Sequence, residues 1–70
     1  MHILLIEGMT DEASKRVISN AISNAVPGMT FEVDLRRKQV RYRNASPSQQ
    51  AAVRNAVRDA GYGILESGRN

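Results

Sequence analysis

The sequence contains no cysteine and no tryptophan, and its 70 residues include one histidine, one phenylalanine and two tyrosines. Without cysteine, neither a disulfide nor a thiolate-bound metal adds to its stability. A chain of this length buries only about 60% of the surface that its unfolded form exposes, so one compact core or a partner has to supply the stability. The length allows one domain, which we place at residues 1–66, with a flexible tail over residues 67–70.

Long apolar segments are also missing. The apolar run near the N-terminus, residues 3–6, ends at Glu7 and follows no basic segment. Such a run is too short for a signal peptide or for a membrane-spanning helix. We therefore expect a soluble, cytoplasmic, monomeric protein that does not associate with membranes.

Charges of both signs are present. Ten lysines and arginines face seven aspartates and glutamates, which gives a formal net charge of +3. This mild excess permits a nucleic acid or an acidic protein as partner, but it requires neither. Because 41% of the residues are apolar, the composition indicates a folded domain rather than a disordered tail.

The first half of the chain predicts a strand followed by a helix. Residues 3–6 have the apolar character of a buried strand. Thr10 or Asp11 is positioned to cap the helix, which ends at Pro27 and Gly28 because these residues do not continue a helix. The apolar stripe of this helix comprises Val17, Ile18, Ala21, Ile22 and Ala25.

The second half predicts a hairpin, a helix and a last strand. Apolar and polar residues alternate over residues 29–43, interrupted by a basic turn, and this places Glu32 and Asp34 on the same outer face as Arg41 and Arg43. A Ser-Pro-Ser-Gln capping box then starts a second helix, a glycine ends it, and a short strand follows. The order βαββαβ predicts an α+β, ferredoxin-like fold, with two helices on one face of a four-stranded antiparallel sheet.

The loop after the first strand carries the most informative motif. Residues 8–14, Gly-Met-Thr-Asp-Glu-Ala-Ser, resemble the Gly-Met-Thr-Cys-x-x-Cys signature of heavy-metal-associated domains, which include copper chaperones and the N-terminal modules of copper-transporting ATPases. Further similarity lies at Ile18 and Ile22, in the segment 31–35 and in the closing segment 56–62. The resemblance implies a non-enzymatic domain whose ancestry is copper binding and delivery. It also implies a partner that is another heavy-metal-associated domain or a metal-transporting ATPase.

The resemblance implies a degenerate member of that family, because Asp11 and Ser14 stand where it places the two metal-binding cysteines. Cu(I) is a soft ion that selects thiolate and thioether ligands, whereas a carboxylate is a hard donor and a serine hydroxyl is neutral. Met9 belongs to the same loop, with core packing as its alternative role. We predict that Met9, Asp11 and Ser14 form at most a weak metal site and that no cofactor is tightly bound. The sequence leaves open whether the cysteines were lost naturally or by engineering.

The resemblance further implies that partners dock on the loop and the first helix. The matching positions of this chain are Thr10, Glu12, Lys15, Arg16 and Tyr62. A docking or regulatory role follows, in which Lys15 and Arg16 meet an acidic surface. Catalysis is not expected, because Ser14 has no base nearby in the sequence and the histidine, His2, lies at the other end of the first strand.

Two alternatives remain open at this stage. The loop could bind a metal ion other than Cu(I), such as a harder one, through Asp11, Glu12 or Met9, although calcium takes six to eight oxygen ligands. The hairpin could bind nucleic acid weakly, but related sheets stack bases on two or three aromatic side chains, and Tyr42 of the third strand points inward. We therefore favour a solvated basic hairpin and do not expect a nucleic acid partner. The basic residues concerned are Arg36, Arg37, Lys38, Arg41 and Arg43.

Overall fold

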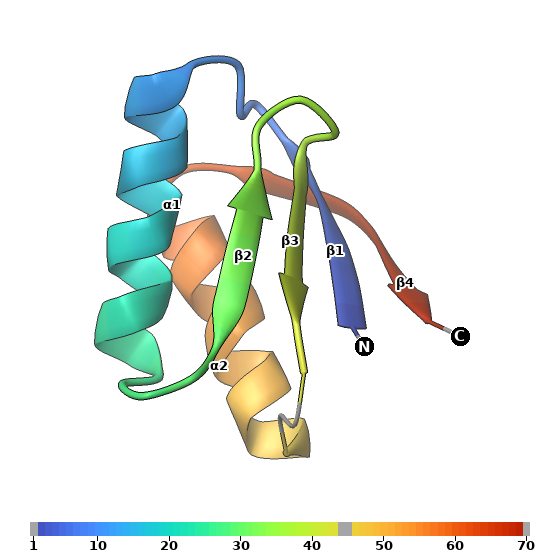
Figure 1. The fold of residues 1–70 in the computed structure, drawn as a ribbon. Helices are drawn as coiled ribbons and strands as arrows, with labels where there is room; N and C mark the ends of the chain where they lie inside the picture. Colours follow the sequence, from blue (N-terminus) through green and yellow to red (C-terminus); the bar gives the residue numbers. More distant parts are fainter. Residues whose placement is uncertain (1, 44–45, 70) are drawn as a thin grey trace.

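The computed structural model describes residues 2–43 and 46–69. The elements follow in the order β1 (His2–Glu7), α1 (Glu12–Ala25), β2 (Phe31–Asp34), β3 (Gln39–Tyr42), α2 (Pro47–Asp59) and β4 (Gly63–Arg69). The strands form one antiparallel sheet in the order β2-β3-β1-β4, and both helices pack on the same face of it (Figure 1). The predicted ferredoxin-like βαββαβ fold is confirmed.

The core lies between the sheet and the two helices. Alternate residues of β1 and β3 point toward the helices, as the period of two in a strand requires. Burial of these side chains supplies most of the stability that a chain of this size can gain. The buried apolar residues are Leu4, Ile6, Met9, Ile18, Ile22, Val26, Val33, Val40, Tyr42, Val53 and Val57.

The buried face of α1 differs from the predicted apolar stripe. Ile18 and Ile22 are fully buried, as predicted, but Val17 keeps 43% of its surface exposed and Ala25 is exposed as well. Ser14 is the third buried residue of this helix. Because residues four positions apart share a helix face, Ser14, Ile18 and Ile22 all point toward the sheet, and Val17 points away from it.

The β2–β3 hairpin is held firmly to the end of β1. Its turn closes with a hydrogen bond from the Lys38 N–H to the Leu35 carbonyl at 3.3 Å, and Lys38 has a φ of 58°. The Lys38 carbonyl then accepts a hydrogen bond from the Ile6 N–H at 2.9 Å. The turn is therefore fixed against the strand that leads into the β1–α1 loop.

The last strand runs past residue 66, where the sequence places the end of the domain. β4 pairs with β1 as far as Arg69, which lies opposite His2, because β1 has a free edge on the side away from β3. The flexibility predicted for residues 67–69 stays a prediction, and residue 70 lies outside the described residues. A register shift between Leu5 and Ile6 leaves Leu65 as an extra residue in β4, with 62% of its surface exposed.

The second helix begins with the predicted capping box. The Ser46 hydroxyl accepts a hydrogen bond from the Gln49 N–H at 3.2 Å, and the Gln49 side chain accepts one from the Ser46 N–H at 2.8 Å. After the helix, Gly61 takes a φ of 96°, which glycine adopts without strain. Among the described residues, no helix has both the length and the apolar character that crossing a membrane requires.

Candidate functional site

Three connections meet at one end of the sheet, and together they form the surface that we call the loop end. It comprises the β1–α1 loop (residues 8–11) with the first turns of α1 that follow it (residues 12–17), the β2–β3 turn (residues 35–38) and the α2–β4 turn (residues 60–62). The first two lie at the top of the view in Figure 1. The hydrogen bond from Ile6 to Lys38 joins the β2–β3 turn to the strand that precedes the loop.

Tyr62 joins the third connection to the loop. A Cβ atom added at Gly8 would lie 3.2 Å from Cδ1 of Tyr62, so the aromatic ring lies directly against the backbone of Gly8. Gly8 has a φ of 99°, which side chains other than glycine rarely allow. The structure therefore places Tyr62 beside the loop, half-buried, as one of the predicted docking residues.

Asp11 and Ser14, which the sequence resemblance predicts to lie at the positions of the family's cysteines, are bonded to each other. Asp11 is the N-cap of α1, and its Oδ1 atom accepts hydrogen bonds from the backbone N–H of Ser14 at 2.9 Å and from the Ser14 hydroxyl at 2.8 Å. Ser14 is only 8% exposed. The backbone bond and then the hydroxyl bond lower the pKa of Asp11 from its ordinary value, because both stabilise the ionised carboxylate.

Met9 lies in the hydrophobic core and is fully buried. For its sulfur to bind a metal at the loop surface, the side chain would have to leave the core and give up its apolar contacts. The structure therefore brings two of the three predicted metal residues, Asp11 and Ser14, together and packs the third one inside.

The donor atoms of the loop do not fit Cu(I). A carboxylate and a hydroxyl that are engaged with each other offer no soft ligand, and the thioether of Met9 is inaccessible. A harder cation would need several oxygen ligands. Within residues 2–43 and 46–69, no three histidine, aspartate or glutamate side chains are grouped so that they could hold a metal ion.

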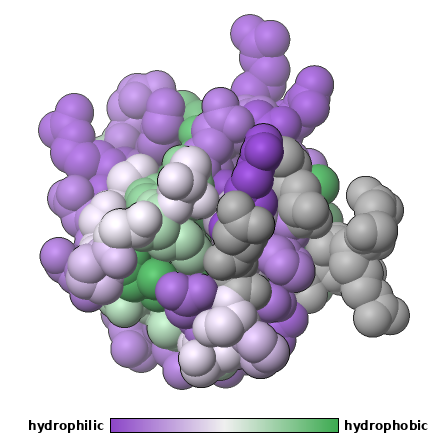
Figure 2. Space-filling view, turned by 60° about the horizontal axis from the view of Figure 1, so that its bottom comes forward, coloured by the Kyte–Doolittle hydropathy of each residue, from purple (hydrophilic) through white to green (hydrophobic). Residues whose placement is uncertain are grey.

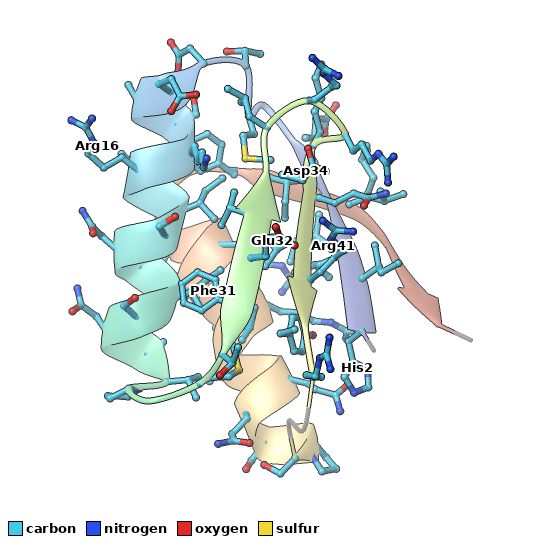
Figure 3. All side chains as sticks on the ribbon, viewed as in Figure 1. His2, Arg16, Phe31, Glu32, Asp34 and Arg41 are labelled. Atoms are coloured by element: carbon cyan, nitrogen blue, oxygen red, sulfur yellow. The ribbon has the colours of Figure 1, made fainter. Side chains whose placement is uncertain are left out.

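The predicted docking residues surround this closed loop. Thr10, Glu12 and Arg16 are exposed, and Lys15 is half-buried. Figure 3 shows Arg16 extending from α1 into solvent. Val17 was not predicted to be a surface residue, because the sequence groups it with the apolar stripe of the helix. In the structure its apolar side chain is exposed, next to Arg16 in the chain. Its position beside the stripe, and not within the stripe's regular spacing, could have indicated this exposure.

The basic residues of the hairpin do not form one cluster. Arg41 donates a hydrogen bond to Glu32 at 2.7 Å and lies 3.8 Å from Asp34 (Figure 3), which confirms the predicted acid–base pairing for Arg41. Arg37 lies 3.9 Å from Asp34 and also donates its backbone N–H to that carboxylate. Arg43 follows β3 at the end opposite the turn and is exposed.

No aromatic side chain is available for base stacking on the outer face of the sheet in the part of the chain that the structure describes. Phe31 packs against the core, and Tyr42 is 4% exposed and stacks on His2 with ring centroids 5.3 Å apart. Burial raises the pKa of Tyr42, and the positive charge of Arg54 opposes this shift. The inward position predicted for Tyr42 is confirmed.

Comparisons with known proteins identify the family. No protein-family model and no curated protein matches this sequence. An NMR structure of a heavy metal binding protein from Thermotoga maritima has a TM-score of 0.80 and 17% sequence identity, and covers 99% of this chain and 97% of that one. This likeness shows the shared fold. The structure of a CopZ metallochaperone has a TM-score of 0.69 and 30% sequence identity, and covers 93% of this chain and 100% of that one. The chain belongs to the metallochaperone family.

Within this metallochaperone-family fold, the loop end brings the predicted site residues together. Asp11, Ser14 and Tyr62 occupy its centre, with Lys15 and Arg16 beside them on the first turns of α1. Arg43 is separated from this end by the length of β3. The arrangement combines a closed, hydrogen-bonded loop with exposed charged and apolar side chains.

Proposed function

We propose that this domain is a non-catalytic docking or regulatory module, and that its loop does not carry copper in the way its family's thiolate loop does. The hydrogen bonds between Asp11 and Ser14 carry the proposal. In the family these two positions hold the metal between two cysteines. Here a carboxylate and a hydroxyl bind each other at 2.8 Å, so the start of α1 is held together without a metal.

The chemistry of the pair opposes metal exchange. The Oδ1 atom of Asp11 already accepts two hydrogen bonds from Ser14. A soft ion would have to break these bonds and would gain only oxygen ligands in return. Binding of a harder cation by the same loop remains the second candidate, and it would be visible in the same titration.

The surface around the loop supports docking. Lys15 and Arg16 make no ion pair within the described residues, and Val17 is 43% exposed. Charged groups around a small apolar contact are typical of the surfaces through which proteins recognise each other. We propose that the partner is another heavy-metal-associated domain or a metal-transporting ATPase, and that the domain acts as a cytoplasmic monomer.

The test is an NMR titration of the isotope-labelled protein with Cu(I) under reducing conditions, followed by Zn(II) and other divalent ions. We expect the amide signals of residues 9–14 and of Tyr62 to stay in place at stoichiometric metal. Glu12→Gln tests the harder-cation candidate, because it removes the second carboxylate of that site and leaves the Asp11–Ser14 bonds intact. Saturable shifts confined to residues 9–14 and Tyr62 would instead show that the loop binds metal.

A further inference from the structure

Some acidic side chains of this protein are paired with basic residues or cap a helix. Glu32 and Asp34 are paired with Arg41, and Asp34 is also within reach of Arg37. Asp11 is engaged in capping α1. Most of the negative charge of the hairpin is thereby neutralised on the outer face of the sheet.

The basic residues at the loop end are not neutralised in this way. Among the described residues, Lys15, Arg16, Arg36 and Lys38 take part in no ion pair. The acids nearest to them in the chain are Asp11 and Glu12 on the α1 side and Asp34 beside the turn; Asp11 caps α1, and Asp34 is paired with Arg37 and Arg41. The loop end therefore carries an excess of positive charge that comes from two separate elements, α1 and the β2–β3 turn.

The turn presents its charges from a rigid support. The Lys38 carbonyl is bonded to the Ile6 N–H at 2.9 Å, and the Arg37 N–H is bonded to the Asp34 carboxylate at 3.0 Å. These bonds hold the backbone of Arg36 and Lys38 at the same end of the sheet as the β1–α1 loop. The two basic elements thus flank the loop, as Figure 1 shows for the backbone.

We infer that the β2–β3 turn is a second arm of the docking surface, and that Arg36 and Lys38 contact an acidic protein together with Lys15 and Arg16. The inference rests on the proposed docking function and names the chemistry of the partner. The unpaired charges complement a surface rich in aspartate and glutamate.

Other features favour a protein over a nucleic acid. Among the side chains that the structure describes, the outer face of the sheet has no aromatic one for stacking, and it carries the carboxylates of Glu32 and Asp34, which repel phosphates. The loop end also includes the exposed side chains of Val17 and Glu12. An apolar contact and an acid among the basic residues suit a patterned protein surface better than a uniform polyanion.

The opposite end of the molecule provides a matched control. Figure 2 shows this end, where hydrophilic side chains surround a limited hydrophobic patch. Arg43 is exposed there, in a groove that Pro27, Gly28 and Gln49 also line. Arg16→Glu, Arg36→Glu and Arg43→Glu change the net charge equally, and each replaces an exposed side chain.

The experiment titrates each variant with a glutamate-rich synthetic peptide and follows the amide signals by NMR at low and at physiological salt. Far-ultraviolet circular dichroism verifies that the variants are folded. We expect Arg16→Glu and Arg36→Glu each to weaken peptide binding by roughly two- to fivefold, the effect of one exposed ion pair, and Arg43→Glu to leave it unchanged. The peptide should shift signals at residues 8–16 and 35–38, and added salt should weaken its binding.

The outcomes separate the two proposals. A loss with Arg16→Glu but none with Arg36→Glu would overturn the second arm and leave the docking function in place. No loss with either variant would overturn both proposals. Equal losses in all three variants would show attraction by net charge alone and would also overturn the inference. Tighter binding of a single-stranded RNA of equal charge, with shifts at residues 35–38, would assign the turn to nucleic acid instead.

Discussion

The two helices of this protein start with the same spacing of polar residues but with different consequences. At α2, Ser46 and Gln49 each accept a hydrogen bond from the other's backbone. At α1, Asp11 accepts both bonds, one from the Ser14 backbone and one from its hydroxyl. Both arrangements satisfy N–H groups that have no partner within the helix. At α1, however, the capping residues are those that the sequence resemblance predicts to lie at the family's metal-binding positions.

The surroundings of the two caps differ as well. Ser46 and Pro47 are exposed, whereas Ser14 is 8% exposed and Met9, just before the α1 cap, is fully buried. The start of α1 is thus tied to the core, and the start of α2 is a surface feature. The comparison teaches that a spacing of three residues at a helix start serves either metal binding or capping, depending on the side chains placed there.

The largest expected effect comes from restoring thiolates at α1. The double variant Asp11→Cys/Ser14→Cys should bind Cu(I) several orders of magnitude more tightly than the native chain, because it replaces hard donors by two soft ones. Competition with a Cu(I)-specific chelator under reducing conditions measures the change. Each single cysteine variant is a control, since one thiolate cannot chelate the ion. A double variant no better than the single ones would show that the loop geometry, and not the ligand type, prevents binding.

A large effect on stability is expected from the core side of the same loop. Met9→Ala should lower the free energy of unfolding by about 2–5 kcal/mol, because it leaves a cavity beneath the start of α1. Pro47→Ala, at the exposed start of α2, should change it by less than about 1 kcal/mol. Urea denaturation of both variants measures the difference. Similar values for the two would contradict the claim that only α1 is anchored in the core at its start.

A smaller effect is expected at the α2 cap. Ser46→Ala should lower the free energy of unfolding by about 0.5–2 kcal/mol, because the Gln49 N–H loses its acceptor. Ser46→Asp restores an acceptor and should recover most of that loss. Thermal unfolding followed by circular dichroism compares the three proteins. An equal loss in both variants would mean that the hydroxyl itself, rather than any capping oxygen, is required at this position.

The local features of the fold were predictable from sequence, and the features that depend on distant elements were not. The capping box at Ser46 and the pairing of Arg41 with Glu32 follow from signals a few residues apart or from strand alternation. The exposure of Val17 depends on how α1 packs against its neighbours. The extension of β4 to Arg69 depends on pairing with the free edge of β1.

The candidate site shows the same division. The family resemblance located Asp11, Ser14 and Tyr62, but the mutual bonds of Asp11 and Ser14 required the cap geometry. The approach of the β2–β3 turn to the loop end depends on the bond from Ile6 to Lys38, which joins residues far apart in the chain. No short motif encodes such a contact.

The central claim, that Asp11 closes the loop by binding Ser14, is tested most directly by an NMR pH titration of the Asp11 carboxyl carbon. Its pKa should lie below the ordinary value of 3.8, and the Ser14 amide signal should titrate with it. Because the folded pKa is lowered, the stability that the cap contributes is present above pH 3.8 and is lost as the pH falls through the folded pKa.

Asp11→Asn, which keeps an oxygen acceptor but does not ionise, should abolish the titration of the Ser14 amide. An Asp11 carboxyl that titrates at its ordinary value, with a Ser14 amide that does not respond, would contradict the account.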